Sequence, residues 1–361
     1  MNARPRISVL GGGVIGAAIA YSLSGKQAEV DLFDAGRPAG GTSRTSFAWI
    51  NAQSTHDRAY FDLRTKAVRA YRELPEPLQR AMGLRWTGSL TFNDSPEALE
   101  RALGRLQSWG HPVRGIDAGE FRALEPALHN PPPLALHCES DGAVEPRRAT
   151  FALLSAARER GARLHSNTKV LGLRERNGRI VSVRLAGSQI ACDGVVLATG
   201  ADTNELLGAL GGQLPVASET DTLLYLKAAP GIFTRVLNAP TYHARQRLDG
   251  QIVLGSDARG ERGELSPNSA AQLIRRFAAD FLWEPAALAY TLRTSRRVVP
   301  ADGLPVVGHV APLSNLYVAV THSGITLAPL IAQIAAEEIL AAGAATLAPQ
   351  FRPDRFPPAP R

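Results

Sequence analysis

The clearest hydrophobic pattern lies near the amino terminus. An apolar run at residues 7–10 leads through a glycine-rich turn into an alanine-rich segment, and a second apolar run then ends at Asp34. Short apolar runs between glycine or polar residues are typical of buried strands, whereas the alanine-rich segment has the length of a helix. The pattern therefore predicts a strand, a helix that begins near Val14, and a second strand.

The rest of the chain carries two kinds of hydrophobic pattern. Helical spacing, interrupted by prolines in its first occurrence, is found at residues 56–82, 147–160, 268–283 and 326–342. Period-two alternation, which is typical of half-buried strands, is found at residues 85–92, 216–227, 241–256 and 287–299. Residues 162–200 predict three strands and a hairpin with an Asn-Gly turn. Because the two patterns are interleaved, we expect an α/β fold with two discontinuous domains.

The glycine-rich turn has the spacing of a dinucleotide-binding motif. Gly11 permits the tight turn, Gly13 lets a diphosphate approach the backbone, and Gly16 lets the helix pack against the strand. The helix also directs unpaired N–H groups and its positive dipole end at the diphosphate. Asp34 lies where a carboxylate can accept both hydroxyls of an adenosine ribose. Its charge would repel a 2′-phosphate, so NADP is not expected.

Composition and charge narrow the class of protein only slightly. The 361 residues suffice for about two domains, and no apolar run reaches the roughly 18 to 20 residues of a membrane span. Cys138 and Cys192 lack a partner motif, so we expect reduced thiols, no metal site and a cytoplasmic protein. The net charge of +7 is spread along the chain, which argues against nucleic-acid binding. Peripheral contact with the inner face of a membrane stays open.

Four separate segments together resemble one family. They are the glycine motif with Asp34, GTSRTSFAWIN at residues 41–51, VVLATGADTNELL at residues 195–207, and residues 296–339. The last segment holds R-x-x-x-x-D-G-x-P-x-x-G, beginning at Arg297, and then H-S-G-x-T-L-A-P. With these segments the chain resembles the FAD-dependent amine and D-amino acid oxidase family, which includes glycine oxidase and sarcosine oxidase. Ser46 and Ala48 depart from that family, which has asparagine and glycine there.

The resemblance implies a fold and a cofactor. It implies a Rossmann-like FAD-binding domain, at residues 1–84, 141–215 and 296–361, and a discontinuous, mainly antiparallel α+β substrate-binding domain, at residues 85–140 and 216–295. The residues implied for FAD binding are Gly11, Gly13, Val14, Ile15, Gly16, Asp34, Gly41, Thr42, Ser43, Val170, Thr199, Gly200, Ser323, Gly324, Ile325 and Thr326. We expect noncovalent FAD, because no cysteine follows Cys192 and GTSRTSFAW has no histidine that could carry the flavin.

The last helix and its flanking residues suggest where the flavin and the substrate lie. A helix that begins at residues 324–326 can donate to the negative charge of a reduced flavin, although Ser323 or Thr326 alternatively serves only as an N-cap. The resemblance assigns Arg297 to the substrate carboxylate, with a salt bridge to Asp302 or to another acid at the domain interface as the structural alternative. Tyr242 and Trp49 are candidates for substrate contacts or for core packing, and His322 is the candidate catalytic residue near the flavin.

The implied reaction is oxidation of a CH–NH bond. A D-amino acid, glycine or sarcosine would transfer a hydride to flavin N5, giving an imine and then a keto acid, with O2 or a quinone as electron acceptor. One alternative is a 2-hydroxy acid dehydrogenase of the L-2-hydroxyglutarate type, which would need His322 as a base. Another is the flavoprotein subunit of a multi-subunit dehydrogenase. Either a homo-oligomer or a partner subunit is compatible with the sequence, and no nucleic-acid partner is expected.

Overall fold

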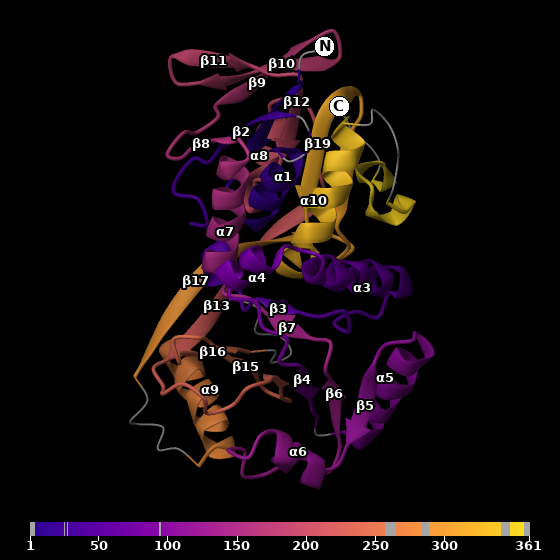
Figure 1. Ribbon diagram of the computed structural model, residues 1–361, viewed down its shortest axis with the longest axis vertical. Helices are drawn as coiled ribbons and strands as arrows, with labels where there is room; N and C mark the ends of the chain where they lie inside the picture. Colours follow the sequence, from indigo (N-terminus) through magenta and orange to yellow (C-terminus); the bar gives the residue numbers. More distant parts are fainter. Residues whose placement is uncertain are drawn as a thin grey trace.

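The computed structural model describes residues 4–24, 26, 28–93, 95–256, 265–282, 289–340 and 347–356. In Figure 1 a six-stranded sheet with its helices forms the upper part of the molecule, and an eight-stranded sheet lies in the lower part. Two long strands, β13 (Val216–Leu226) and β17 (Tyr290–Pro300), extend from the middle of the molecule into the lower part. The mixed α/β class predicted from the sequence is confirmed.

The six-stranded sheet has the order β18-β19-β12-β1-β2-β8, and only β18 is antiparallel to its neighbour. Its strands are β1 (Arg6–Leu10), β2 (Glu29–Phe33), β8 (Arg163–His165), β12 (Gly194–Leu197), β18 (Val306–Val310) and β19 (Leu313–Val320). Val9 and Val196 pack in one cluster with the helices α1 (Val14–Ser24), α7 (Pro146–Glu159) and α10 (Gly324–Leu340).

The opposite face of the six-stranded sheet is also covered. Leu10 and Leu197 pack against a small antiparallel sheet of β9 (Gly172–Arg176), β10 (Arg179–Leu185) and β11 (Ser188–Ala191). Since the sheet is buried on both faces, its central strands β1 and β12 read as nearly continuous apolar runs and not as alternating ones.

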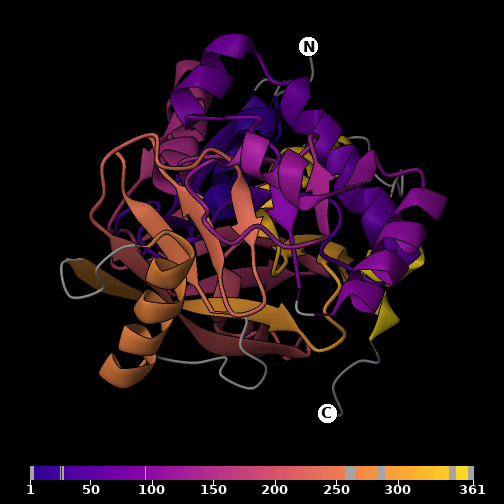
Figure 2. The same ribbon diagram turned by 90° about the horizontal axis from the view of Figure 1, so that it is seen from below.

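The eight-stranded sheet has the order β17-β13-β16-β15-β14-β4-β6-β5, and only β14 and β4 pair in parallel. The other strands are β4 (Ser89–Thr91), β5 (Val113–Ile116), β6 (Ala135–Cys138), β14 (Val236–Asn238), β15 (His243–Gln246) and β16 (Ile252–Gly255). Helix α9 (Pro267–Asp280) buries Leu273 and Phe277 against Leu237 and Leu254 of this sheet, and Figure 2 shows it lying beside the strands.

The remaining elements lie between or after the strands of these sheets. They are α2 (Thr42–Thr45), β3 (Trp49–Ile50), α3 (Arg58–Arg72), α4 (Glu76–Met82), α5 (Pro96–Ser108), α6 (Ala118–Leu124), β7 (Gly142–Ala143), α8 (Thr203–Gly208) and the short turns η1 (Gly200–Asp202), η3 (Pro349–Phe351) and η4 (Pro353–Arg355). None of the helices among the described residues combines the length and hydropathy that a bilayer span requires.

Several element boundaries differ from those expected. The strand expected over residues 85–92 is confined to Ser89–Thr91, because Arg85 makes only an isolated bridge to Ala143. Helices α5 and α6 were not expected, although Ser95 and Asp117 cap them with side-chain oxygens. The expected ends at residues 283, 287–288 and 341–342 lie outside the described residues. The predicted domain boundaries stay a prediction.

Candidate functional site

The carboxyl ends of four parallel strands meet at one edge of the six-stranded sheet. Gly11 follows β1, Asp34 follows β2, Thr199 follows β12 and Thr321 follows β19. These four residues line a cavity of about 1760 Å³, which also reaches strands β13 and β17 of the other sheet. Ligands of open parallel sheets bind at this edge. Pockets for a single small molecule measure about 300 to 1,000 Å³, so this cavity has room for a dinucleotide and a second ligand.

The turn after β1 requires glycine for two physical reasons. Gly11 has a φ of +104°, and a Cβ there would lie 2.4 Å from the carbonyl oxygen of Ala198. A Cβ on Gly16 would lie 1.9 Å from the carbonyl oxygen of Gly11. Because neither position carries a side chain, a ligand can come close to the backbone of the turn and of the first residues of α1.

Asp34 and Ser43 organise the loops around this turn. The Asp34 carboxylate accepts hydrogen bonds from the backbone N–H groups of Gly12, at 2.7 Å, and Gly36, at 2.9 Å. Each carboxylate oxygen can accept a further hydrogen bond, so a ribose hydroxyl can still bind there. Ser43 Oγ accepts from the N–H group of Val14 at 2.9 Å, and this contact joins α2 to the start of α1.

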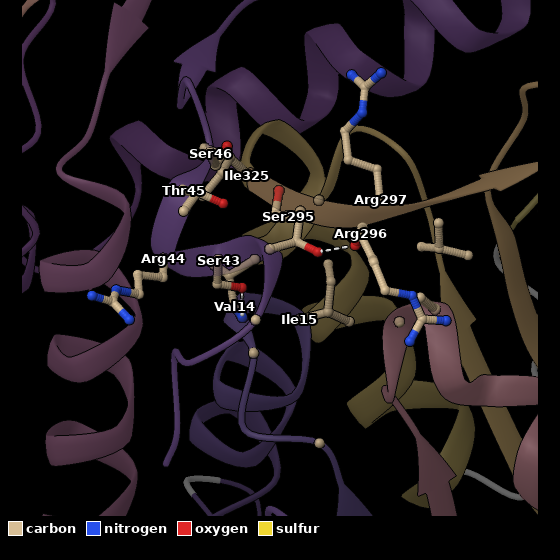
Figure 3. A pocket seen from close by; sticks show the side chains of 18 of the residues that line it. Val14, Ile15, Ser43, Arg44, Thr45, Ser46, Ser295, Arg296, Arg297 and Ile325 are labelled. Atoms are coloured by element: carbon tan, nitrogen blue, oxygen red, sulfur yellow. Dashed lines mark hydrogen bonds between the residues drawn. The ribbon is translucent and has the colours of Figure 1, made fainter. Parts of the chain in front are cut away.

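Helix α2, which follows Gly40 and Gly41, also contacts the eight-stranded sheet. Thr42 Oγ1 donates to the carbonyl oxygen of Arg296 at 2.5 Å, which connects α2 to β17. In Figure 3 Arg44 of α2 points away from this part of β17, and Arg296 and Arg297 leave the strand in different directions. Arg296 pairs with Asp202 at 3.2 Å and donates to Ser218, so its guanidinium lies away from Arg297.

Most of the residues predicted to bind the cofactor line the cavity. They are Gly11, Gly13, Val14, Ile15, Asp34, Gly41, Thr42, Ser43, Val170, Thr199, Gly200, Ser323, Gly324, Ile325 and Thr326. Gly16 is not among the lining residues and packs instead against the carbonyl oxygen of Gly11.

The start of helix α10 forms another wall of the cavity. Gly324 is half-buried, and a Cβ there would come no closer than 3.6 Å to the side chain of Ile15. Thr326 Oγ1 donates to the carbonyl oxygen of Trp49 at 3.2 Å. Tyr71 OH donates to the carbonyl oxygen of Ile325 at 2.6 Å. These contacts connect α10 with β3 and α3.

Arg297 lies in the cavity among partners that the sequence did not identify. Its Nη1 lies 3.0 Å from Nε2 of His322, its Nε lies 3.5 Å from Asp221, and its Nη2 lies 3.8 Å from Glu219. The buried Nε has no hydrogen-bond partner among the described residues. Asp302, one of the expected alternative partners, pairs instead with Arg355 at 2.7 Å. The expected salt bridge to another acid is found with Asp221 and Glu219.

His322 and Trp49 both line the cavity. A guanidinium can only donate, so His322 Nε2 accepts the hydrogen bond from Arg297 and carries no proton in this arrangement. Trp49 Nε1 donates to Asp141 Oδ2 at 3.0 Å, which anchors the indole ring at the cavity wall.

The structure does not place Tyr242 at the site. Its side chain is 1% exposed, packs against Phe277 and donates to Asp280 Oδ2 at 2.5 Å. The neighbouring His243 lines the cavity instead, because successive side chains of an extended segment point to opposite faces. Of the two alternatives for Tyr242, the structure therefore supports core packing and not a substrate contact.

Sequence reasoning missed three residues near the cavity. Arg64 of α3 is 3% exposed and lines the cavity, and Asp221 of β13 lines it beside Arg297. Asp141 is buried behind Trp49, and its burial raises its pKa to about 6. Of these three residues, only Arg64 could be noticed in the sequence, as an arginine on the apolar face of a helix.

Comparison with known proteins finds relatives that align with nearly the whole chain. The chain is 28% identical to glycine oxidase of Pseudomonas aeruginosa over 348 residues, which cover 92% of this chain and 94% of that protein. It is 26% identical to a subunit of opine oxidase from Agrobacterium tumefaciens over 360 residues, 93% of each chain. The crystal structure of glycine oxidase from Geobacillus kaustophilus matches the fold with a TM-score of 0.88 and 24% identity, over 98% of this chain and 99% of that one.

The cavity fits the cofactor that these comparisons imply. The turn at Gly11 and Gly16 admits a diphosphate at the start of α1, and the Asp34 carboxylate can receive a ribose. A family model described as FAD dependent oxidoreductase matches residues 6–338. The match spans most of the chain, so this protein belongs to the DAO family of FAD-dependent oxidoreductases.

Proposed function

We propose that the protein oxidises the carbon–nitrogen bond of a small amino acid or N-methyl amino acid. The observation that carries this proposal is Arg297, whose guanidinium lines the cavity with a buried Nε that has no hydrogen-bond partner among the described residues. A planar guanidinium binds a carboxylate through two parallel hydrogen bonds. The names of the relatives, glycine oxidase and opine oxidase, support an amino acid or related amine as the substrate.

When bound, FAD would supply the redox chemistry as acceptor of a hydride from the substrate carbon. The residues of the chain bind and orient the substrate. Arg297 would hold the carboxylate, Trp49 and His243 would bound the cavity, and the small residues Ser323 and Gly324 let a planar ring approach the start of α10. Loss of the hydride from the neutral amine would leave a protonated imine of the substrate, which water hydrolyses to a keto acid with release of ammonia or an amine.

Oxidation of a 2-hydroxy acid is the second candidate, and the surroundings of His322 argue against it. An alcohol is a far weaker acid than an ammonium group, so this reaction needs a base beside the reacting carbon. His322 Nε2 accepts a hydrogen bond from Arg297, and that contact occupies the lone pair a base would use. The ammonium group of a bound amino acid is a far stronger acid and can lose its proton to water before the hydride leaves, so an amine substrate needs no such base.

Several further properties are proposals of the same kind. We infer noncovalent FAD, since no cysteine follows Cys192, and a cytoplasmic location, since both cysteines are buried and unpaired. Either O2 or a quinone would reoxidise the flavin. A partner chain is supported by the name of the opine oxidase relative, which is a subunit.

An anaerobic reduction experiment tests the proposal. The purified yellow protein is mixed with glycine, sarcosine, D-alanine, D-proline or 2-hydroxyglutarate, and bleaching of the flavin absorbance band is followed. We expect bleaching by at least one amino acid and none by the hydroxy acid. Arg297→Ala should lose reduction by carboxylate substrates while keeping its flavin, and Arg297→Lys should retain a part of it. Bleaching by 2-hydroxyglutarate alone, or unchanged kinetics in Arg297→Ala, would refute the proposal.

A further inference from the structure

Two acidic side chains flank Arg297 on the same face of the eight-stranded sheet. In the antiparallel pairing of β13 and β17, Glu219 lies opposite Arg297 and Asp221 lies opposite Ser295. Side chains two residues apart on a strand share a face, so Glu219, Asp221 and Arg297 point to the same side. Asp221 lines the cavity, whereas Glu219 is not among the lining residues.

The contacts leave Asp221 accessible to a ligand. Its Oδ2 lies 3.5 Å from Arg297 Nε, a separation of opposite charges without a hydrogen bond. Its side chain is 30% exposed, and the side chain of Arg297 is 23% exposed. A ligand in the cavity can therefore approach both charges at once.

The local sum of charges argues against a ligand that carries only a carboxylate. Arg297, Asp221 and Glu219 add up to a charge of −1, since one guanidinium faces two carboxylates. Arg293 is the next cation on the same face of β17, but its guanidinium lies over the ring of Tyr225, at 4.4 Å from the centroid. A simple carboxylate would add a third negative charge beside Arg297, whereas a zwitterion adds none.

We propose that Asp221 receives the ammonium group of the substrate while Arg297 receives its carboxylate. The site then selects zwitterionic amino acids. Simple carboxylates and 2-hydroxy acids of the same shape bind less well, because either ligand places an uncharged group against Asp221 and a negative charge near it. Asp221 is thus a specificity residue for the amino group. This inference rests on the proposed function, in particular on carboxylate binding by Arg297.

Equilibrium binding of two matched ligands to the oxidised holoprotein tests this inference. The pair is 2-aminoisobutyrate, which has no Cα–H bond and cannot be oxidised, and pivalate, which carries a methyl group in place of the ammonium. Binding is measured from the change in the flavin absorbance spectrum. We expect the wild-type protein to bind 2-aminoisobutyrate at least tenfold more tightly than pivalate. Asp221→Asn should abolish that preference by weakening the zwitterion and strengthening pivalate.

Glu219→Gln is the matched control, because it removes the same charge on the same strand face outside the cavity lining. It should keep most of the preference. If Asp221→Asn changes the affinity of both ligands by the same factor, Asp221 only positions Arg297 and the inference fails. If Glu219→Gln abolishes the preference equally, the effect is one of general charge and the inference also fails. If Arg297→Ala binds pivalate as well as the wild type does, the proposed carboxylate site itself fails.

Discussion

Arg64 of α3 donates a hydrogen bond of 2.6 Å to Oγ of Ser323, the residue just before α10, across a separation of 259 residues. The same guanidinium donates to the carbonyl oxygen and the side chain of Asn51, at 3.1 and 2.8 Å. Within the described residues no carboxylate forms an ion pair with this buried side chain. The positive end of the α10 dipole lies at the same place. Two sources of positive potential thus meet at the wall of the cavity where we expect the flavin.

Arg64→Met should make the midpoint potential of the bound flavin more negative. Reduction adds negative charge to the ring, and a buried guanidinium stabilises that charge by about 1 to 2 kcal/mol at an effective dielectric constant of about 20. For a two-electron couple this corresponds to about 20 to 40 mV. The potential is measured by equilibration with a reference dye during slow anaerobic reduction.

Arg69→Met is the control for Arg64→Met. Arg69 lies on the exposed side of the same helix, so water and salt screen its charge. Its removal should shift the midpoint potential by less than about 5 mV. Equal shifts in the two variants would show that Arg64 has no particular relation to the flavin.

Gly16→Ala should produce a protein that does not retain FAD. The new Cβ would lie 1.9 Å from the carbonyl oxygen of Gly11, so the turn that accepts the diphosphate must move. Overpacking of this kind destabilises a protein by about 1 to 3 kcal/mol. The flavin-to-protein absorbance ratio after gel filtration and the melting temperature are the measurements.

Gly104→Ala is the matched control for Gly16→Ala. Gly104 lies in the middle of helix α5, and a Cβ there meets nothing within 4 Å. The same substitution should raise the stability by about 0.5 to 1 kcal/mol, because alanine favours the helix. FAD retention in Gly16→Ala at the wild-type level would contradict the steric argument.

Tyr242→Phe should lower stability and leave flavin reduction unchanged. The hydroxyl donates to Asp280, whose burial raises its pKa above the usual range, and its loss leaves this carboxyl without the donor. Such a loss costs about 1 to 3 kcal/mol. Tyr21→Phe removes an exposed hydrogen bond with Arg160 and should change stability by less than about 0.5 kcal/mol. A changed apparent substrate affinity in Tyr242→Phe would return this residue to the site.

The parts of the site that the sequence predicted depend on local geometry. Gly11 has a positive φ, Gly16 is required by its contact with the carbonyl oxygen of Gly11 in the same turn, and Asp34 follows the next strand of the same unit. Tyr242 shows the limit of this reasoning. A shift of one residue exchanges the two faces of an extended segment, and nothing in the sequence showed that His243 and not Tyr242 would face the cavity.

Arg64 and Asp221 could not be predicted because their partners are distant in sequence. Arg64 meets Ser323 only after α3 and α10 pack together, and Asp221 meets Arg297 only in the register of β13 and β17. The family resemblance supplied Arg297, but it did not supply the acidic residues beside it. The positions of those side chains depend on tertiary packing, which the hydrophobic period of a single segment does not reveal.

A buried cluster behind Trp49 contains two groups whose protonation should change the stability of the protein with pH in opposite directions. Cys138 Sγ donates to Asp141 Oδ1 at 3.3 Å and lies 3.1 Å from His111 Nε2. Burial raises the pKa of Asp141 to about 6 and lowers that of His111 to about 4. In the unfolded chain these groups titrate near 3.8 and 6.5.

The two shifts act on stability with opposite signs. Between about pH 4 and 6 the folded protein holds a proton on Asp141 that the unfolded chain releases, so this group makes stability fall as pH rises. Between about pH 4 and 6.5 the unfolded chain holds a proton on His111 that the folded protein lacks, so this group makes stability rise. Each group changes the free energy of unfolding by about 3 kcal/mol across its pH window, so the two opposite contributions nearly cancel in the wild type.

Asp141→Asn should therefore give a melting temperature that rises from pH 4.5 to 6.5 relative to the wild type, because only the His111 contribution remains. The asparagine oxygen can still accept from Trp49, Gln53 and Ser89, so the packing is preserved. His111→Gln should show the opposite slope, since only Asp141 then titrates in this window. The double variant should return to the nearly flat wild-type profile. If both single variants shift the slope in the same direction, the two groups do not titrate as their burial requires.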